Sequence, residues 1–458
     1  MDLCSEKNEI YPVTFTGYSA EGLGVCRIDG QVVFVAGALD GERAEVRIVK
    51  VLKQLAYGRI ERLLEASPHR IASDCPYFVQ CGGCSMRHMD YAEELRFKQG
   101  RIRDALTRIG GVDPGALPVL GAEETDGYRN KALFPVGEAD GVPIAGFYRA
   151  RSHDVVPVER CRLQAAHADA AKNAILTWMR ENRVSVYDET QNKGLVRHLY
   201  VRSAFGTGQV LVCVVVNGKK LPNEAGLVDA IRKAVPEVNS IVLAVNREQT
   251  NAVLGAEYRT LWGADVIEDT LCGLNFRLSP RSFYQVNRKQ AQRLYAIARE
   301  KAALTKNDTA IDLYCGTGTI SLVLAKDAGE VIGVEVIPAA IEDAKENAAR
   351  NGVENARFFC ADAGEAAARL AKEGIRPTAV VVDPPRKGLS EDVIEAIAAM
   401  SPDRVVYVSC DPGTLARDVK LLTEKGYALV SAEGVDLFPR TPHVESVVLL
   451  VRTDSVAI

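Results

Sequence analysis

The stretch Asp312-Leu313-Tyr314-Cys315-Gly316-Thr317-Gly318-Thr319 decides the fold of this chain. It ends an apolar run over 309–313 and precedes a helical pattern, so we expect it to form the loop between a strand and a helix. The glycines let the backbone turn tightly beside a ligand, and the helix N-terminus favours negative charge. Glu335, about 20 residues further on at the end of the next apolar run, is placed to bind ribose hydroxyls. The pattern predicts a pocket for a nucleotide-like cofactor.

Strand-like and helical runs alternate throughout this part of the sequence. The strand-like runs cover residues 309–313, 330–335, 357–361, 379–382, 404–409 and 444–451, and helical patterns lie between them. This alternation indicates a doubly wound, Rossmann-like parallel sheet, which binds ligands where its strands end. Nicotinamide binding is disfavoured because the loop continues Thr319-Ile320-Ser321, without the third glycine of the dinucleotide fingerprint.

Further strand ends carry residues suited to chemistry. Asp362 ends the third run, where it would reach an adenine amino group, and Asp383 ends the fourth. Cys410 follows the fifth run and precedes a helix, a position that lowers a thiol pKa and faces a ligand cleft. Glu445 lies at the start of the last run. Asp362 and Asp383 taken alone are equally well explained as solvated strand ends, but the occurrence of the glycine loop, Glu335, Asp362 and Asp383 at consecutive strand ends favours a site. From position alone, Cys410 is better explained as a small core residue and Glu445 as an exposed strand-end carboxylate.

The composition limits the classes of protein to consider. The chain has 458 residues, 47% hydrophobic and 25% charged, with a net charge of −4, which predicts a globular protein of two or three domains. We find no secretory signal and no apolar run long enough to cross a bilayer, so we expect a cytoplasmic protein without membrane contact. The charge balance does not decide on RNA binding, because a basic groove can lie on an acidic protein.

The N-terminal and middle parts follow other patterns. Five short strand-like runs with glycine turns within residues 1–64 predict a small OB-like β-barrel. Residues 65–270 mix strands, at 196–203, 210–216 and 240–245, with helices at 165–181 and 224–234. A helical pattern over about 91–109 is a candidate to pack onto the C-terminal part. We therefore expect an α/β multidomain protein, divided into residues 1–64, 65–270 and 271–458.

Three cysteines stand close together near the start of the middle part. Cys75, Cys81 and Cys84 are separated by five and then two residues. Thiolates at this spacing suit zinc or an iron–sulfur cluster, and Cys161 is the best remote candidate for a fourth ligand. The spacing does not separate the two metals. A radical S-adenosylmethionine enzyme would also combine a cluster with a nucleotide-like cofactor. The spacing between Cys75 and Cys81 is longer than the first cysteine spacing of that class.

Together these motifs resemble the bacterial RNA uracil-C5 methyltransferases, especially the 23S ribosomal RNA branch with an N-terminal TRAM domain and a 4Fe-4S cluster. The resemblance covers essentially the whole chain. It is carried by two long segments, Ser279-Pro280-Arg281-Ser282-Phe283-Tyr284-Gln285-Val286-Asn287 and Ser409-Cys410-Asp411-Pro412-Gly413-Thr414-Leu415-Ala416-Arg417-Asp418. The resemblance implies transfer of a methyl group from S-adenosylmethionine to C5 of uridine, a TRAM domain over 1–64, and a central α/β domain that carries the cluster.

The resemblance also assigns roles to single residues. It implies Cys410 as nucleophile and Glu445 as general base. Its cofactor positions fall on Gln285, Tyr314, Glu335, Asp362 and Asp383, and its cluster ligands on Cys75, Cys81, Cys84 and Cys161.

The implied chemistry needs both a thiol and a base. Thiolate addition at C6 of uracil turns C5 into a carbanion that attacks the methyl sulfonium, and a base then removes the C5 proton so that the thiolate leaves. The target base must flip out of its stack, and Phe283 is a candidate to stack on it. Arg129 and Lys131 lie in a segment that resembles one near the RNA, although an ordinary charged surface explains them equally well.

The cluster is expected to be structural, because cysteine fills all four positions. A variant without Cys81 should then lose folding or RNA affinity. Two other functions stay open. One is a tRNA methyltransferase that makes the same product, although typical bacterial members of that branch lack the TRAM domain and the cluster. The other is a non-catalytic RNA-binding or assembly factor, against which the intact Cys410 and Glu445 argue. We expect a monomer with 23S ribosomal RNA as its partner.

Overall fold

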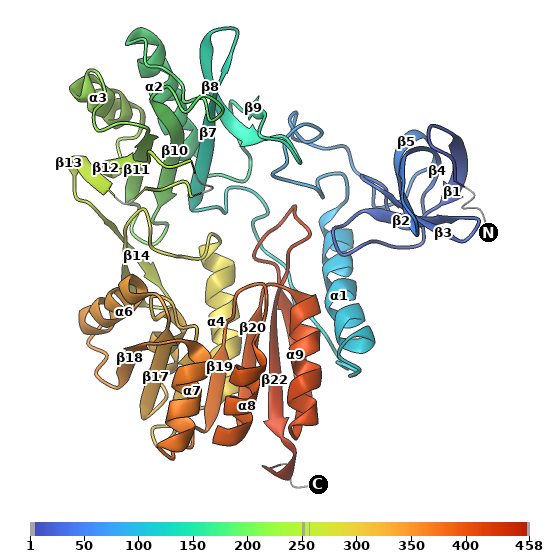
Figure 1. Cartoon of the computed structure of the whole chain (residues 1–458), viewed down its shortest axis with the longest axis vertical. Helices are drawn as coiled ribbons and strands as arrows, with labels where there is room; N and C mark the ends of the chain where they lie inside the picture. Colours follow the sequence, from blue (N-terminus) through green and yellow to red (C-terminus); the bar gives the residue numbers. More distant parts are fainter. Residues whose placement is uncertain (1–4, 250–251, 256, 456–458) are drawn as a thin grey trace.

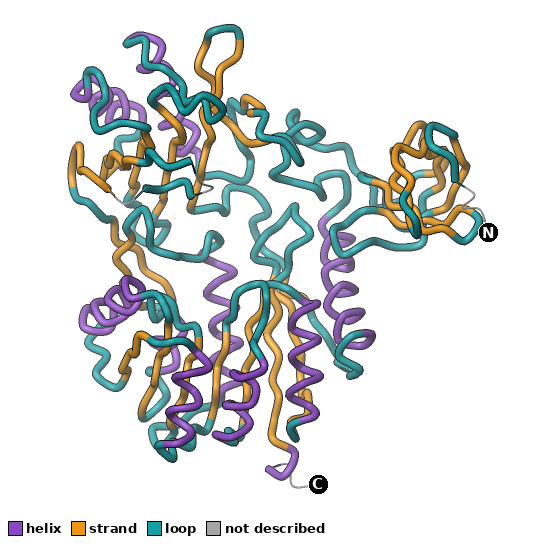
Figure 2. The backbone as a smooth tube through the Cα atoms, in the orientation of Figure 1, coloured by secondary structure: helices purple, strands orange, loops and turns teal. Residues whose placement is uncertain are grey.

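The structure, a computed structural model, describes residues 5–249, 252–255 and 257–455. An N-terminal barrel, a middle sheet and a C-terminal sheet form its main parts (Figures 1 and 2). The blue barrel stands to one side, while the green middle sheet lies above the orange and red C-terminal sheet. Helix α1 (Tyr91–Arg108) runs between the barrel and the C-terminal sheet.

Five strands build the N-terminal barrel, as the sequence predicts, and they pair in the order β1-β4-β5-β3-β2. Their side chains alternate between the apolar interior and the surface, as Val33 and Val35 on the buried side of β3 illustrate. The Thr16 N–H donates to the Val25 carbonyl at 2.8 Å and so joins the segment after β1 to β2. The strands are β1 (Ile10–Thr14), β2 (Gly24–Ile28), β3 (Gln31–Val35), β4 (Arg43–Val51) and β5 (Leu55–Glu65).

The middle sheet lies between two cores. In β11 (Val210–Val216), residues 210, 212, 214 and 216 pack with α2 (Ala166–Glu181) and α3 (Glu224–Ala234), whereas residues 211, 213 and 215 pack toward the C-terminal part. Burial on both faces explains why β11 is an unbroken apolar run. The sheet order is β13-β12-β11-β10-β7-β8-β9. The other strands are β7 (Lys131–Ala139), β8 (Val142–Tyr148), β9 (Val155–Pro157), β10 (Val196–Ser203), β12 (Val238–Val245) and β13 (Glu257–Gly263).

The C-terminal sheet has the order β18-β17-β16-β19-β20-β22-β21-β6, and β16 to β20 are parallel. This confirms the predicted doubly wound sheet. The hairpin of β14 (Ile267–Leu271) and β15 (Leu274–Leu278) and helix α4 (Arg288–Ala302) precede it. Its strands are β16 (Thr309–Leu313), β17 (Glu330–Glu335), β18 (Ala356–Cys360), β19 (Ala379–Val382), β20 (Arg404–Ser409), β21 (Tyr427–Val435) and β22 (Glu445–Arg452), and its helices are α5 (Thr319–Leu324), α6 (Pro338–Arg350), α7 (Ala363–Lys372), α8 (Glu391–Met400) and α9 (Pro412–Glu424).

Two elements from earlier in the chain join this sheet. Strand β6 (Val119–Leu120) pairs with β21, and α1 packs against α9. A buried ion group fixes α1: the Lys98 ammonium donates to Glu94 at 2.6 Å and to Asp436 at 2.7 Å, and none of the three side chains is exposed. The Tyr91 hydroxyl donates to the second Asp436 oxygen at 2.8 Å. Such a group is tolerated in a core because each charge is paired.

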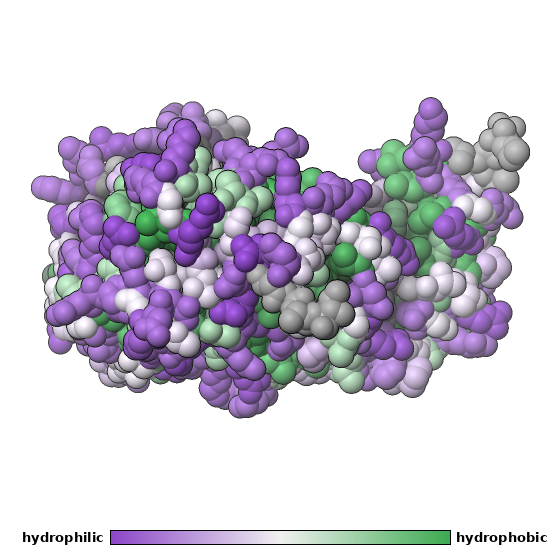
Figure 3. Space-filling view, turned by 90° about the horizontal axis from the view of Figure 1, so that it is seen from below, coloured by the Kyte–Doolittle hydropathy of each residue, from purple (hydrophilic) through white to green (hydrophobic). Residues whose placement is uncertain are grey.

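No described helix is both long and apolar enough to cross a membrane. Figure 3 shows that hydrophilic side chains cover most of the face seen from below, with apolar side chains in small, separate patches. Among the large apolar side chains that are exposed elsewhere in the fold, Phe283 is 67% exposed, and Val336 and Ile337 follow directly after Glu335. Exposed apolar groups beside a predicted pocket are available to contact a ligand.

We predict that Lys98→Met lowers the free energy of unfolding by about 3–5 kcal/mol, because it leaves Asp436 buried without a counter-ion and leaves Glu94 with only the Arg440 guanidinium, 3.6 Å away. Urea denaturation followed by circular dichroism measures this. The control is Arg43→Met, which removes an exposed ion pair with Glu65 of 2.9 Å. It should cost less than about 1 kcal/mol. Equal effects of the two substitutions would show that the buried group does not fix α1.

Candidate active site

The predicted cofactor residues meet where the strand order of the C-terminal sheet reverses. Strand β16 pairs with β17 on one side and with β19 on the other, all three in parallel. The loop after β16, Glu335 at the end of β17 and Asp383 directly after β19 therefore lie at one edge of the sheet. This reversal point is where open α/β sheets bind ligands.

The glycine loop holds the Glu335 carboxylate in place. One Glu335 oxygen accepts the Gly316 N–H at 3.2 Å. The other accepts the N–H groups of Val336 and Ile337 at 2.9 and 3.0 Å. Tyr314, Gly316 and Gly318 have φ values of 68°, 54° and 81°, which give the loop its tight turn. A Cβ on Gly318 would lie 3.1 Å from atoms of α6 and β18, so a larger residue would push the loop away.

Tyr314 directly follows β16 and Asp362 follows β18, so both lie at this edge of the sheet. Burial raises the pKa of Tyr314 to about 12, and the nearby Asp362 carboxylate adds to that rise. Asp362 also caps α7, because its Oδ1 accepts the Gly364 N–H at 2.9 Å and the Glu365 N–H at 3.4 Å. The structure thus gives the exposed Asp362 side chain a local structural role next to the expected adenine position.

Gln285 is linked to the same edge by Tyr295, a residue that the sequence analysis did not identify. The Gln285 side chain hydrogen-bonds to Tyr295 on α4. Burial raises the pKa of Tyr295 well above its ordinary value, and the Asp383 and Glu445 carboxylates raise it further. Tyr295 is therefore close to both acids. It lies within an ordinary amphipathic helical pattern, so only the packing of α4 against the sheet identifies it.

Cys410 and Glu445 come together because β22 runs antiparallel to β20. In this pair Ser409 lies opposite Ser446, so the residue after Ser409 and the residue before Ser446 are neighbours at the strand ends. Burial, Glu445 and Asp383 raise the pKa of the Cys410 thiol to about 11, while the Arg386 guanidinium opposes the rise. The lowered thiol pKa expected from the position before a helix is therefore wrong for the free protein, because burial and the two nearby acids act in the other direction. Burial and Asp383 raise the pKa of Glu445 to about 8, again against Arg386.

The pocket concentrates acidic groups in a poorly solvated space. Burial raises the pKa of Asp312 to about 7, with Asp383 and Glu335 adding to that rise, and Ser321 donates to Asp312 at 2.5 Å. Burial alone raises the pKa of Asp383 to about 7. Water would screen the repulsion between exposed charges of one sign, but in this buried space each carboxylate disfavours ionisation of its neighbours. The site is therefore suited to a cationic ligand that restores the charged forms.

The residues expected near RNA fall into two places. Phe283 is exposed next to Gln285, as expected for a side chain that stacks on a base. Arg129 instead bridges two segments: its N–H donates to the Leu163 carbonyl at 3.0 Å, and it pairs with Asn287 in an isolated bridge. Lys131 is half-buried, and burial lowers its pKa. Arg129 and Lys131 are thus built into the fold, not displayed on an open surface.

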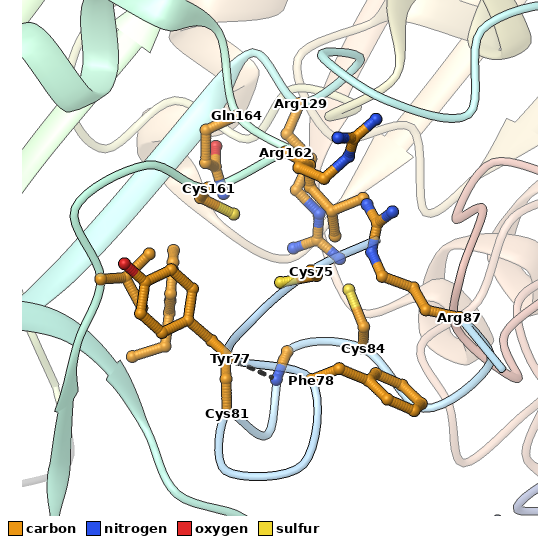
Figure 4. A pocket seen from close by; sticks show the side chains of 14 residues that line it. Cys75, Tyr77, Phe78, Cys81, Cys84, Arg87, Arg129, Cys161, Arg162 and Gln164 are labelled. Carbon is orange, nitrogen blue, oxygen red and sulfur yellow. Dashed lines mark hydrogen bonds between the residues drawn. The ribbon is translucent and has the colours of Figure 1, made fainter. Parts of the chain in front are cut away.

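The four predicted cluster cysteines line one cavity of about 70 Å³. Figure 4 shows the sulfur atoms of Cys75, Cys84 and Cys161 directed into this space, with Arg87, Arg129 and Arg162 to one side. Burial raises the pKa of Cys81 and Cys84, and that of Cys161 to about 11. A neighbouring thiol adds to each rise, which shows that the four groups are close to one another.

Among the described residues, no group of three or more His, Cys, Asp or Glu side chains is arranged to hold a metal ion. The cavity nevertheless has polar atoms without partners. The Nε atoms of Arg87 and Arg129 and the Oε1 atom of Gln164 are buried without a hydrogen bond, and all three residues line the cavity. Buried donors and acceptors in native proteins are usually satisfied, so the two Nε donors and the Oε1 acceptor indicate that a further group belongs beside them.

The tRNA (Uracil-5-)-methyltransferase family matches residues 91–453, and the TRAM domain matches residues 5–60. The chain belongs to the tRNA (Uracil-5-)-methyltransferase family. Among its relatives are uncharacterized RNA methyltransferases of Halalkalibacterium halodurans, 44% identical, and of Caldanaerobacter subterraneus, 43% identical. The matches cover 97% of this chain in both cases, and 97% and 98% of the relatives.

A solved structure of the same kind shares the fold over nearly the full length. It is the Pyrococcus abyssi tRNA (uracil-54, C5)-methyltransferase in complex with S-adenosyl-L-homocysteine, with a TM-score of 0.77 and 26% identity. The match covers 96% of this chain and 100% of that chain. The family and this neighbour establish the chain as an S-adenosylmethionine-dependent RNA uracil-5 methyltransferase with an N-terminal TRAM domain.

For this family member we predict that Arg386→Gln shifts the pH dependence of methyl transfer to higher pH. Arg386 favours the charged thiolate and carboxylate, so its loss raises the pKa of both Cys410 and Glu445. Activity should fall most below pH 8 and recover in part above it. Initial rates across the pH range measure the shift. The adjacent Lys387→Gln, whose charge does not act on Glu445, is the control. Equal profiles for both variants would contradict the assignment.

Proposed function

We propose that this enzyme methylates C5 of uridine in 23S ribosomal RNA through a covalent bond between Cys410 and C6. The observation that carries the proposal is that Cys410 and Glu445 directly adjoin the paired Ser409 and Ser446 of β20 and β22, with Asp383 close enough to raise the pKa of the thiol. A thiol, a buried carboxylic acid and a cofactor loop at one sheet edge are what C5 methylation of a pyrimidine needs.

The electrostatics support an order of events. With a pKa near 11, the Cys410 thiol is protonated at neutral pH in the free protein. The methyl donor is a sulfonium cation, and its binding beside Asp383 and Glu335 would favour the thiolate. Cys410 then adds to C6 of the flipped uridine, and the electron pair moves to C5 and its enolate. C5 takes the methyl group, and the donor leaves as the neutral thioether.

Glu445 then completes the reaction. Its carboxylate removes the C5 proton, the C5–C6 double bond forms again, and the Cys410–C6 bond breaks to release the thiolate. A pKa near 8 makes Glu445 a stronger base than an ordinary glutamate, which suits a proton transfer near neutral pH. Asp383 contributes by raising that pKa, and Arg386 keeps it from rising further.

We assign the remaining site residues as follows. Glu335 binds the ribose hydroxyls, because its carboxylate is held at the mouth of the loop by the Gly316 N–H and by the N–H groups of Val336 and Ile337. Phe283 stacks on the flipped base. Tyr314, Asp362, Gln285 and Asp383 contact the methyl donor, and Arg129 and Lys131 orient the segment that faces the RNA.

We also propose that Cys75, Cys81, Cys84 and Cys161 hold a 4Fe-4S cluster. The support is a single cavity lined by all four thiols, with apolar walls and with unpartnered donors on Arg87 and Arg129. A cube of four irons spaces its thiolates more widely than a single ion does. When bound, the cluster would cross-link the loop over 75–84 to the segment at 161.

Protein purified without oxygen should contain about four iron and four sulfide per chain. Cys81→Ser should lose both, together with the visible charge-transfer absorption. The control is Cys272→Ser, which changes a cysteine in the turn of the β14–β15 hairpin. Metal analysis by mass spectrometry gives the result. One equivalent of zinc per chain, or full folding without any metal, would contradict the assignment of a 4Fe-4S cluster to these cysteines.

The solved neighbour favours a second substrate, because that protein is a tRNA (uracil-54, C5)-methyltransferase. The four-cysteine cavity supports ribosomal RNA, since the resemblance ties that feature to the 23S branch. We also propose residues 1–64, 65–270 and 271–458 as the functional units. The pairing of β6 and the packing of α1 attach the segment over 91–120 to the last of them.

Labelled S-adenosylmethionine separates the two substrates. We predict labelled 5-methyluridine from 23S ribosomal RNA and none from tRNA. Cys410→Ala should reduce the rate by more than about 1,000-fold because no other group can add to C6. Cys272→Ala should keep the activity. Label in tRNA alone would show that the substrate is tRNA and not 23S ribosomal RNA. No label in either RNA would favour a non-catalytic RNA-binding factor.

A further inference from the structure

The segment that leads into Glu445 is held in an unusual way. Residues 436–444, which we name the strap, connect β21 to β22 and contain no helix or strand. Asp436, Leu437 and Val444 are completely buried. Because the strap lacks secondary structure, its carbonyl groups need partners from other elements.

Four separate parts of the molecule provide these partners. From α4 and its N-cap, Gln290 donates to the Asp436 carbonyl at 3.0 Å and Asn287 to the Leu437 carbonyl at 3.2 Å. From α1, Lys98 donates to the Phe438 carbonyl at 3.3 Å. The Tyr128 hydroxyl, from the segment before β7, donates to the Pro439 carbonyl at 3.0 Å. The strap is thus a shared contact of elements far apart in the sequence.

The cysteine loop provides the fourth set of contacts. The N–H groups of Ser85 and Met86, directly after Cys84, donate to the Arg440 carbonyl at 3.1 and 3.3 Å. On its other side, the Arg440 N–H donates to Glu94 at 2.7 Å. Arg440 has φ of 71°, a left-handed conformation that is uncommon for a residue with a side chain.

Glu445 itself depends on this support. In the described part of the chain, no hydrogen bond or ion pair is formed by its carboxylate, although the residue is only 4% exposed. Its direction is therefore set by its backbone, which the strap brings in from one side and the β20–β22 pairing from the other. A shift of the strap would move the carboxylate directly.

We propose that the strap positions Glu445 for removal of the C5 proton, with Tyr128, Gln290 and Lys98 as positioning residues. This inference rests on the proposed function. Glu445 acts only after the methyl group has been transferred. A loosened strap should therefore slow breakdown of the methylated Cys410 adduct, while thiol addition and methyl transfer keep their rates.

Tyr128→Phe tests this with little change in shape. It removes one hydroxyl from a side chain that is 4% exposed, and with it the bond to the Pro439 carbonyl. The chain offers a matched control: the Tyr427 hydroxyl donates to the Pro402 carbonyl at 3.1 Å, and Tyr427 is 3% exposed. Tyr427→Phe breaks an equivalent bond away from the strap. Gln290→Met is a second variant that acts on the strap at another carbonyl.

Two RNA substrates separate the steps. With ordinary RNA, the measurements are the turnover rate and the amount of covalent protein–RNA adduct on a denaturing gel. With 5-fluorouridine RNA, C5 carries fluorine in place of the proton, so the base has nothing to remove. The rate at which this adduct is trapped then reports thiol addition and methyl transfer alone.

We expect Tyr128→Phe and Gln290→Met to lower turnover by about 5- to 10-fold, with accumulated adduct and unchanged trapping. Tyr427→Phe should match the wild type. Equal turnover in all proteins would contradict the proposal that the strap positions Glu445. A turnover rate and a trapping rate that fall together would contradict it as well. If the wild type traps no adduct and forms no 5-methyluridine, the proposed function fails as well.

Discussion

The antiparallel pairing of β22 with β20 is the constraint on which the site depends. Parallel strands alone would place Cys410, the proposed nucleophile, at the ligand edge but would leave it without the proposed base. The reversed strand brings Glu445 to the same edge, one register step from Ser409 and Ser446. The chain must reach that point through an irregular segment, and the buried Lys98 group, the cysteine loop and Tyr128 all satisfy the backbone of that segment.

The acidic, poorly solvated pocket is suited to a cationic methyl donor. Desolvation makes thiolate and carboxylate costly, and the clustered acids increase that cost for one another. Without a bound cation, the pocket thus favours protonated acids and a protonated, unreactive Cys410 thiol. A sulfonium ion bound there supplies the missing positive charge, so the nucleophile would become reactive only when the donor is in place. The fixed Arg386 charge works in the same direction but does not suffice by itself.

The sequence predicted most of the C-terminal sheet because its strands are apolar and glycines and acids mark their ends. Cys410, Glu335 and Asp383 could be placed from those ends alone. Glu445 could not, since its partner strand is antiparallel and the register is set by packing. Tyr295 was missed because a helix pattern gives no sign of what its buried face meets. The attachment of β6 and α1 to the sheet was only partly predicted, since such contacts depend on long-range packing and not on local pattern.

The most direct test of the account is to locate the covalent bond itself. The protein would be incubated with S-adenosylmethionine and 23S ribosomal RNA that contains 5-fluorouridine, then digested with protease and nuclease for mass spectrometry. The account predicts one modified peptide, in which Cys410 carries a uridine with both fluorine and a methyl group. A bond at another residue, or 5-methyluridine formed from ordinary RNA with no trapped bond at all, would contradict it.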